Sequence, residues 1–348
     1  MSTAHSEFEP FVTIAIPTFN RASWLKNCVV AALSQTYQHF EVVVSDNAST
    51  DETAEVLKQF GDPRLRTVRQ LSNIGLLPNW NACLAEARGD YIVFCSDDDT
   101  LSPRILERCV AVAARDPQIP IILGLCDFYS PADGWLDRAT PSTKFATGVW
   151  EGTRLLIEYL RNNICVGNCS MMIRTEALRA RGGFPYDVPH NSADVAGWAP
   201  LLMKGRAGFV NESCATYCVH GASETSKLTL DGYLHIEREL ANYIVRMANC
   251  AVEDPRARRR VRLEAKLFLA RRIVFALAQH RKRGAKLAEM LPWIWHQRRE
   301  IIYVGAINPL NFAKPIALVL FPKLIADQIR KLKEHYRQLI DSVRSDLI

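Results

Sequence analysis

Residues 91–99 read YIVFCSDDD, an uninterrupted apolar run that ends in a serine and three adjacent aspartates. A short run of this kind is typical of a β-strand that is buried on both faces, as in a parallel sheet. Two similar runs precede it, VTIAIP at residues 12–17 and FEVVVS at residues 40–45. Because helical patterns separate these runs, the sequence predicts an α/β fold with a mainly parallel sheet.

Other elements follow from the same periodicities. We expect further strands at residues 65–69, 119–125 and 215–219, and helices at residues 24–34, 77–87, 103–114, 230–247 and 255–278. Ser49 and Glu52 have the spacing of a capping box, which predicts a helix that begins there.

Polar residues follow the three apolar runs. They are Thr18–Arg21 after the first run, Asp46 and Asn47 after the second, and Asp97–Asp99 after the third. Ligands of open α/β sheets bind beyond the carboxyl ends of the strands, so we expect a ligand site at this edge. No G-x-G-x-x-G motif follows the first run and the chain has no P-loop motif, which disfavours a dinucleotide cofactor.

The acidic triplet Asp97–Asp99 allows two interpretations. Adjacent carboxylates repel one another, and a divalent cation such as Mg²⁺ or Mn²⁺ would relieve that repulsion. A cation held there would also neutralise charge on the diphosphate of a nucleotide substrate. The alternative is a solvated acidic turn that caps the helix starting near Pro103.

Five blocks of sequence resemble the family 2 glycosyltransferases. The blocks occur in that family's order and are IPTFNR (16–21), VVVSDNASTDET (42–53), NIGLLPNWNACLAEARGDYIVFCSDDDTLSP (73–103), GGF (182–184) and the segment around Asp194. The resemblance implies the GT-A fold, which is an α/β nucleotide-sugar-binding domain with a mainly parallel sheet. It also implies inverting transfer of a sugar from a nucleotide-activated donor, with a divalent metal (Mg²⁺ or Mn²⁺) as cofactor.

The resemblance also implies roles for single residues on the donor side. Pro17, Thr18 and Asn20 match the loop around the base and ribose, and Arg21 matches a position near the phosphates. Asp46 matches the aspartate that accepts a hydrogen bond from the base. Asn73 and Gly75 fall in a loop that approaches the donor, Asp97 matches a residue at the ribose or metal, and Asp98 matches the principal metal ligand.

Two further residues belong to the second half of the predicted site. Inversion needs a general base opposite the leaving nucleotide, and Asp194 matches that base in the family. Asp194 could instead only cap the helix that follows it, and Asp187 is the second candidate for the base. By resemblance, His220 completes metal or phosphate binding, although a histidine at a strand end is often only a surface or packing residue.

The charge distribution separates the two ends of the chain. Residues 255–348 carry 21 Lys and Arg against 7 Asp and Glu, a net charge of +14, whereas the preceding residues carry 22 against 30, or −8. We predict a catalytic domain at residues 1–228, with a nucleotide-sugar-binding half (1–130) and an acceptor half (131–228). Residues 229–348 are predicted to be a basic helical region that contacts an anionic membrane or packs on the catalytic domain.

Partners and location follow from the composition and the resemblance. We expect the donor to be a nucleotide sugar, in the first place a UDP-sugar. We expect the acceptor to be a lipid-linked glycan. No nucleic-acid-binding motif accompanies the basic charge, so we expect no nucleic-acid partner. The N-terminus lacks the pattern of a secretory signal and the ten cysteines favour reduced thiols. We therefore expect a cytoplasmic protein, peripheral on the inner face of the cell membrane.

Other functions fit the motifs less well. Sugar nucleotidyltransferases carry a glycine-rich basic loop after the first strand, where this chain has PTFNR. A catalytically inactive, transferase-like binding protein would have lost acids such as Asp46, Asp98 or Asp194. Processive synthases of the family carry a Q-x-x-R-W motif that is absent here, which favours transfer of a single sugar.

Overall fold

The structure is a computed structural model that describes residues 8–132 and 134–282, together with residues 284, 286, 289, 290 and 295. Most of the predicted basic region beyond residue 282 therefore lies outside the described residues. In the described part of the chain, no helix combines the length and the apolarity that crossing a bilayer requires.

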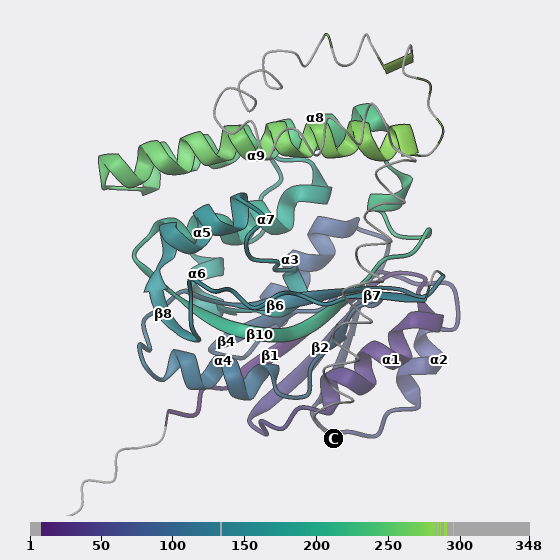
Figure 1. The fold of residues 1–348 in the computed structure, drawn as a ribbon. Coiled ribbons are helices and arrows are strands. Elements are labelled where there is room, and N and C mark those ends of the chain that lie inside the picture. The colour runs from purple at the N-terminus through teal and green to yellow at the C-terminus, as the bar shows by residue number, and fades with distance from the viewer. Residues whose placement is uncertain are drawn as a thin grey trace, which may run out of the picture. The chain divides into compact units, whose positions relative to one another are not determined.

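The first half of the chain folds into the predicted alternation of strands and helices (Figure 1). The predicted and observed bounds agree to within about two residues, with three exceptions: the short second helix, the unpredicted strand β5, and β6, which continues five residues beyond the predicted end at residue 125. The elements are β1 (Val12–Thr18), α1 (Ala22–Leu33), β2 (Phe40–Asp46), α2 (Thr53–Lys58), β3 (Leu65–Arg69), α3 (Leu76–Glu86), β4 (Tyr91–Phe94), β5 (Thr100–Leu101), α4 (Ile105–Ala113) and β6 (Ile121–Ser130).

The second half begins with two short strands, which pair with different neighbours, and its described part ends in two long helices. Its elements are β7 (Trp135–Asp137), β8 (Gly148–Glu151), α5 (Gly152–Leu160), β9 (Met171–Arg174), α6 (Thr175–Arg179), the 3-10 helix η2 (His190–Ser192), α7 (Ala193–Trp198), β10 (Arg206–Cys218), α8 (Leu230–Ala251) and α9 (Pro255–Lys282).

One ten-stranded sheet organises these elements, in the order β3-β2-β1-β4-β9-β6-β10-β5, with β7 paired to β6 and β8 paired to β10. The strands β3, β2, β1 and β4 are parallel, as predicted. Beyond β4 the sheet becomes mixed, because β9 runs antiparallel to both β4 and β6. The carboxyl ends of β1, β2 and β4 therefore lie at one edge of the sheet.

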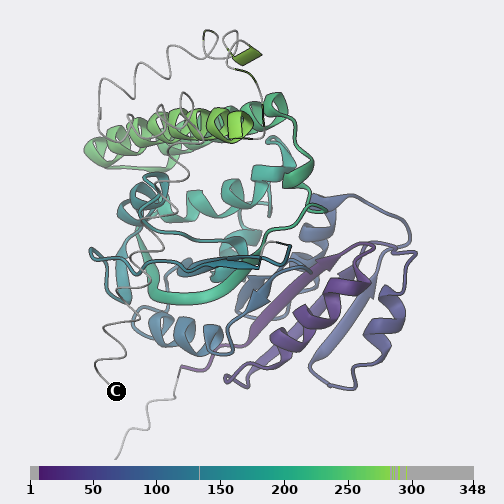
Figure 2. The same ribbon diagram turned by 45° about the vertical axis from the view of Figure 1, so that its right-hand side comes forward.

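Helices pack on both faces of the sheet. Val12, Ile14 and Ile16 of β1 belong to a buried core that also contains apolar residues of α1 and α4. On the opposite face, Ser45 of β2 donates a hydrogen bond to Asn79 of α3 at 2.7 Å. This alternation explains the continuous apolar runs, because both faces of each central strand are covered. Figure 2 shows α1 and α2 beside the parallel strands.

The predicted capping box at Ser49 is wrong. Helix α2 begins at Thr53 without a side-chain cap at Glu52. The Asp51 carboxylate instead accepts hydrogen bonds from the Thr53 backbone N–H at 3.1 Å and from the Ala22 N–H at 3.0 Å. Asp51 thus satisfies backbone groups at the starts of two helices, α1 and α2. Ser49 does not cap α2, because its hydroxyl accepts the Asn20 N–H at 2.9 Å.

Replacing Asp51 by alanine is expected to lower the free energy of unfolding by about 1–2 kcal/mol at neutral pH. Burial alone would raise the pKa of Asp51, but the hydrogen bonds from Ala22 and Thr53 outweigh burial and lower the pKa below 3.8. A lowered folded-state pKa stabilises the fold above the unfolded-state pKa, and that contribution is lost as the pH falls through the folded-state pKa. The Asp51→Ala difference in urea unfolding should therefore shrink in acid, whereas Glu52→Ala should change little at either pH.

The chain divides into two compact units. The first contains residues 1–227 and 242–264, and the second contains residues 228–241 and those from 265 onward. In the second unit, the first part of α8 and the later part of α9 share an apolar core that includes Leu234, Ile273 and Leu277. The predicted domain boundary at residue 228 stays a prediction.

Candidate active site

The carboxyl ends of β1 and β4 are joined by a buried hydrogen bond. Thr18 is the last residue of β1, and its hydroxyl donates to Asp97 Oδ2 at 2.7 Å. Both side chains are buried. Burial and the neighbouring Asp98 raise the pKa of Asp97 to about 7, although Thr18 and Arg21 act in the opposite direction. The predicted convergence of strand ends is therefore present at Thr18 and Asp97.

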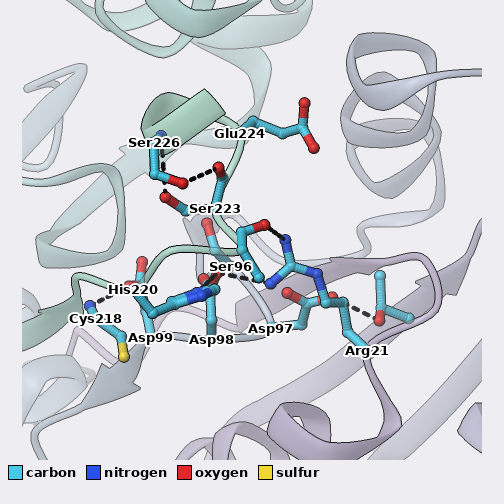
Figure 3. Close-up of polar contacts among 12 residues, drawn as sticks. Arg21, Ser96, Asp97, Asp98, Asp99, Cys218, His220, Ser223, Glu224 and Ser226 are labelled. Carbon is cyan, nitrogen blue, oxygen red and sulfur yellow. Dashed lines mark hydrogen bonds and ion pairs between the residues drawn. The ribbon is translucent and has the colours of Figure 1, made fainter. Parts of the chain in front are cut away.

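Asp98 is the centre of the cluster shown in Figure 3. One of its oxygens, Oδ2, lies 2.9 Å from His220 Nε2 and 3.4 Å from Arg21 Nη1. The same guanidinium donates a hydrogen bond to the Ala222 carbonyl at 3.0 Å. Arg21 and His220 are separated by about two hundred residues in sequence, yet both contact one carboxylate oxygen. The fold thus brings three predicted site residues together.

Asp99 does not cap the helix that follows it. Its carboxylate accepts the backbone N–H of Cys218 at 3.0 Å, which connects the acidic turn to the end of β10. Helix α4 begins at Ile105 without a side-chain cap, so the capping interpretation of the triplet is wrong for this residue. Burial and the charge of Asp98 raise the pKa of Asp99. Asp99 therefore fixes the distance between the turn and His220, two residues beyond Cys218.

Asp46 is a buried carboxylate with two partners. Oδ1 accepts the Ser49 N–H at 2.9 Å, and Oδ2 pairs with Arg69 Nη1 at 2.5 Å. Arg69 is the last residue of β3 and lies directly beside Asp46 in the parallel register. The sequence analysis missed Arg69. The rule that the carboxyl ends of parallel strands lie at one edge of the sheet, which predicted the position of Asp46, applies equally to the end of β3.

Asparagine side chains connect the loops at this edge. Asn20 has a left-handed backbone (φ 52°), and its side-chain oxygen accepts the Thr50 N–H at 2.7 Å. The amide of Asn47 donates to Asn73 Oδ1 at 2.9 Å and to the Gly75 carbonyl at 3.2 Å. The sequence analysis placed Asn47 at this edge but assigned it no role. Together these bonds hold the predicted donor loops against β1 and β2.

Pro17 and Gly75 contribute backbone geometry. Pro17 is buried in β1 in register with Ser45, so its missing N–H removes a hydrogen-bond donor near the strand end. Gly75 precedes α3 with φ of 92°, a conformation that favours glycine, and a Cβ there would lie 3.7 Å from Pro78. The turn before α3 therefore depends on backbone freedom at this position.

Asp194 lies in the first turn of α7 and is half-buried. The preceding residue, Ala193, is fully buried and carries no carboxylate. Asp187 is more exposed, at 65% of its side chain, and pairs with Arg246 at 3.3 Å. The short helix η2 joins the segment after Asp187 to Asp194.

Glu224 lies in the loop after His220 and interacts electrostatically with residues of other elements. The pKa of Glu224 is lowered, first by the hydrogen bond from Lys227 and further by electrostatic interactions with Lys227, His190 and Arg21. His190 lies in η2 and Arg21 directly precedes α1, so both elements lie within electrostatic range of Glu224. Asp194 follows η2 directly. The assignment of Asp194 as the base stays a prediction.

The donor atoms at Asp98 and His220 fit a divalent cation. A carboxylate oxygen suits both Mg²⁺ and Mn²⁺, whereas an imidazole nitrogen is an uncommon ligand of Mg²⁺ and fits Mn²⁺ better. Among the described residues, no group of three or more His, Cys, Asp or Glu side chains is arranged to hold a metal. Magnesium sites at nucleotides commonly use one or two protein carboxylates and take further ligands from the phosphates and water. The pair fits a cation of that kind.

The comparisons with known proteins agree with this geometry. Residues 13–180 match the sequence profile of Glycosyl transferase family 2. The hyaluronan synthase of Pasteurella multocida is 28% identical over 230 residues, which are 64% of this chain but only 22% of that synthase.

Two solved structures share the fold. Staphylococcus aureus TarS (residues 1–349, in complex with UDP) has a TM-score of 0.61 at 19% identity, covering 94% of this chain and 91% of TarS. The mannosyltransferase PcManGT of Pyrobaculum calidifontis, in complex with GDP-Man and Mn²⁺, has a TM-score of 0.53 at 18% identity, covering 90% and 88%.

The sheet and the likeness to TarS show the GT-A fold, and the family profile identifies the class of protein as a glycosyltransferase. Residues 13–180, just under half of the chain, form a Glycosyl transferase family 2 domain.

Proposed function

We propose that this glycosyltransferase transfers a single sugar from a nucleotide sugar, in the first place a UDP-sugar, to an acceptor hydroxyl with inversion. The observation that carries the proposal is the convergence of Arg21, Asp98 and His220 beside the Thr18–Asp97 pair. This cluster combines carboxylates, an imidazole and a guanidinium at the edge of the sheet where nucleotides bind.

The donor side of the proposal assigns the nucleoside to the strand ends. Asp46 accepts a hydrogen bond from the base, and Pro17, Thr18 and Asn20 line the base and ribose. The loop at Asn73 and Gly75, fixed by Asn47, closes against the donor. The ion pair with Arg69 holds the Asp46 carboxylate in one orientation.

The phosphates are assigned to the Asp98 cluster. Asp98 and His220, with Asp97 beside them, would hold a divalent cation, which neutralises charge on the departing nucleoside diphosphate. The guanidinium of Arg21 can turn from Asp98 and Ala222 to the phosphates and add a positive charge there. Its contact with Asp98 is long, and its contact with Ala222 is to a neutral carbonyl.

The chemical step is a displacement at the anomeric carbon. Asp194 accepts the proton of the acceptor hydroxyl as that oxygen forms a bond to the anomeric carbon, while the bond to the diphosphate oxygen breaks. The electron pair of the broken bond leaves with the nucleoside diphosphate, and Arg21 stabilises the added charge. Attack from the face opposite the leaving group inverts the anomeric configuration.

The acceptor is proposed to be a lipid-linked glycan used in the synthesis of a surface polysaccharide. The relationship to hyaluronan synthase supports a glycan acceptor. The positive charge after residue 255 supports an acceptor that is presented at an anionic membrane surface on the cytoplasmic side.

A binding screen tests the donor assignment directly. UDP, UDP-GlcNAc and GDP-Man are added to the full chain with and without Mn²⁺, and the unfolding temperature is measured. A ligand at 100 times its Kd adds about 2.7 kcal/mol to the free energy of unfolding. We expect a rise for one nucleotide class that is larger with Mn²⁺. No rise with any nucleotide sugar would contradict the proposal.

The membrane assignment has its own test at the start of α9. Arg256, Arg259, Arg260 and Arg262 are all exposed within two helical turns. Each basic residue near an anionic surface contributes about 1 kcal/mol, so Arg259→Gln with Arg260→Gln should weaken binding to phosphatidylserine vesicles roughly 30-fold. Binding should also fall as salt rises. Equal binding to neutral vesicles, or none at low salt, would contradict the assignment.

A further inference from the structure

The imidazole of His220 lacks the hydrogen bond that usually orients a metal-binding histidine. Its side chain is 7% exposed and its Nε2 lies 2.9 Å from Asp98 Oδ2. Its other nitrogen, Nδ1, is buried and has no hydrogen-bond partner in the described part of the chain. A histidine ligand commonly donates its second N–H to a carboxylate, a carbonyl or water, which fixes the direction of the ring. At His220 another contact must fix that direction.

That contact is the indole of Trp24. The two rings are stacked, with centroids 4.5 Å apart and planes inclined by 21°. Trp24 lies in the first turn of α1, where its backbone N–H donates to the Arg21 carbonyl at 3.0 Å. The next residue, Leu25, is fully buried and anchors this turn in the core. The indole is therefore held by a turn that cannot rotate freely.

The same helical turn contacts both members of the Asp98–His220 pair. Arg21 and Trp24 are three residues apart, a spacing that places side chains on one side of a helix. Arg21 contacts the Asp98 carboxylate, and Trp24 contacts the His220 ring. The start of α1 thus contacts both a carboxylate and an imidazole, which meet at 2.9 Å.

We propose that Trp24 is a positioning residue that holds the His220 imidazole toward Asp98, so that both side chains can bind one divalent cation. The stack replaces the missing hydrogen bond at Nδ1. Without it the imidazole could turn about its side-chain bonds, and binding would have to restrict that motion. This inference rests on the proposed function, because it concerns the same metal site.

The test measures the affinity of the full-length protein for Mn²⁺ alone by calorimetry. Trp24→Leu removes the aromatic ring and should weaken Mn²⁺ binding about 10-fold, the lower end for the loss of an orienting partner. Trp24→Phe keeps a stacking ring and should stay within about 3-fold of the unchanged protein. Trp150→Leu is the matched control, because Trp150 pairs with Ala207 at the other end of β10.

A double-mutant cycle separates positioning from a general structural effect. In a His220→Ala background no imidazole remains to be oriented, so Trp24→Leu should cause no further loss of Mn²⁺ affinity. A fluorescence measurement covers the case in which Trp24→Leu does not fold. Paramagnetic Mn²⁺ should quench part of the indole emission where Mg²⁺ does not, and that part should be missing in Trp24→Phe.

Three results would overturn the inference. These are unchanged Mn²⁺ affinity in folded Trp24→Leu, an equal loss in the His220→Ala background, and Mn²⁺ quenching that persists in Trp24→Phe. Failure of the proposed function looks different, because the unchanged protein would then bind no nucleotide sugar. If the unchanged protein binds nucleotide but no Mn²⁺, the metal site and the role of Trp24 both fail, while the donor assignment stands.

Discussion

Replacing Asp98 by alanine is expected to abolish the Mn²⁺-dependent part of nucleoside diphosphate binding. Asp98 is the one carboxylate that His220 and Arg21 both contact, and Asp97 and Asp99 are already engaged with Thr18 and with the backbone of Cys218. These contacts hold Asp97 and Asp99 in place, so neither can move into the position of Asp98. A direct ligand contributes several kcal/mol of charge stabilisation, so the gain in UDP affinity on adding Mn²⁺ should fall by roughly 100-fold or more.

Calorimetry with UDP, with and without Mn²⁺, measures this effect. Asp98→Ala also frees Arg21 from its ion pair, so UDP affinity without metal should be unchanged or higher. Glu224→Gln is the matched control, because it removes a carboxylate near Arg21 that has no contact with Asp98. If Mn²⁺ raises the UDP affinity of Asp98→Ala as much as that of the unchanged protein, Asp98 is not a metal ligand.

The second large effect is expected for Asp194→Asn. If Asp194 accepts the proton of the acceptor hydroxyl, its neutral amide cannot do so, and kcat should fall about 100-fold or more. The substitution keeps the size of the side chain in the first turn of α7. Release of nucleoside diphosphate, followed with the donor that the binding screen identifies, measures the change.

Donor affinity separates the base from a residue that only supports the fold. UDP affinity should be the same in Asp194→Asn and in the unchanged protein, because the base contacts the acceptor side. Near-normal turnover in Asp194→Asn would contradict the assignment, and Asp187→Asn would then be examined in the same assay. Asp187 is the less favourable base, since it is largely exposed and paired with Arg246.

Local sequence patterns determined the strands and the edge of the sheet that carries the site. The apolar runs at residues 12–17, 40–45 and 91–95 became β1, β2 and β4, because a run buried on both faces needs only local composition to be recognised. Parallel strands then place their carboxyl ends together, which correctly brought Thr18 and Asp97 within 2.7 Å.

Only the tertiary structure decided which side chains meet. The pairing of Asp98 with His220, of Asp46 with Arg69 and of His220 with Trp24 depends on strand register and on the paths of loops. Asp51 rather than Ser49 accepts a backbone N–H at the start of α2, because the Ser49 hydroxyl accepts the N–H of Asn20 in the loop after β1. Strand β9 enters the sheet between β4 and β6 although it is later in sequence. Such contacts join residues far apart along the chain, and local periodicity contains no information about their relative positions.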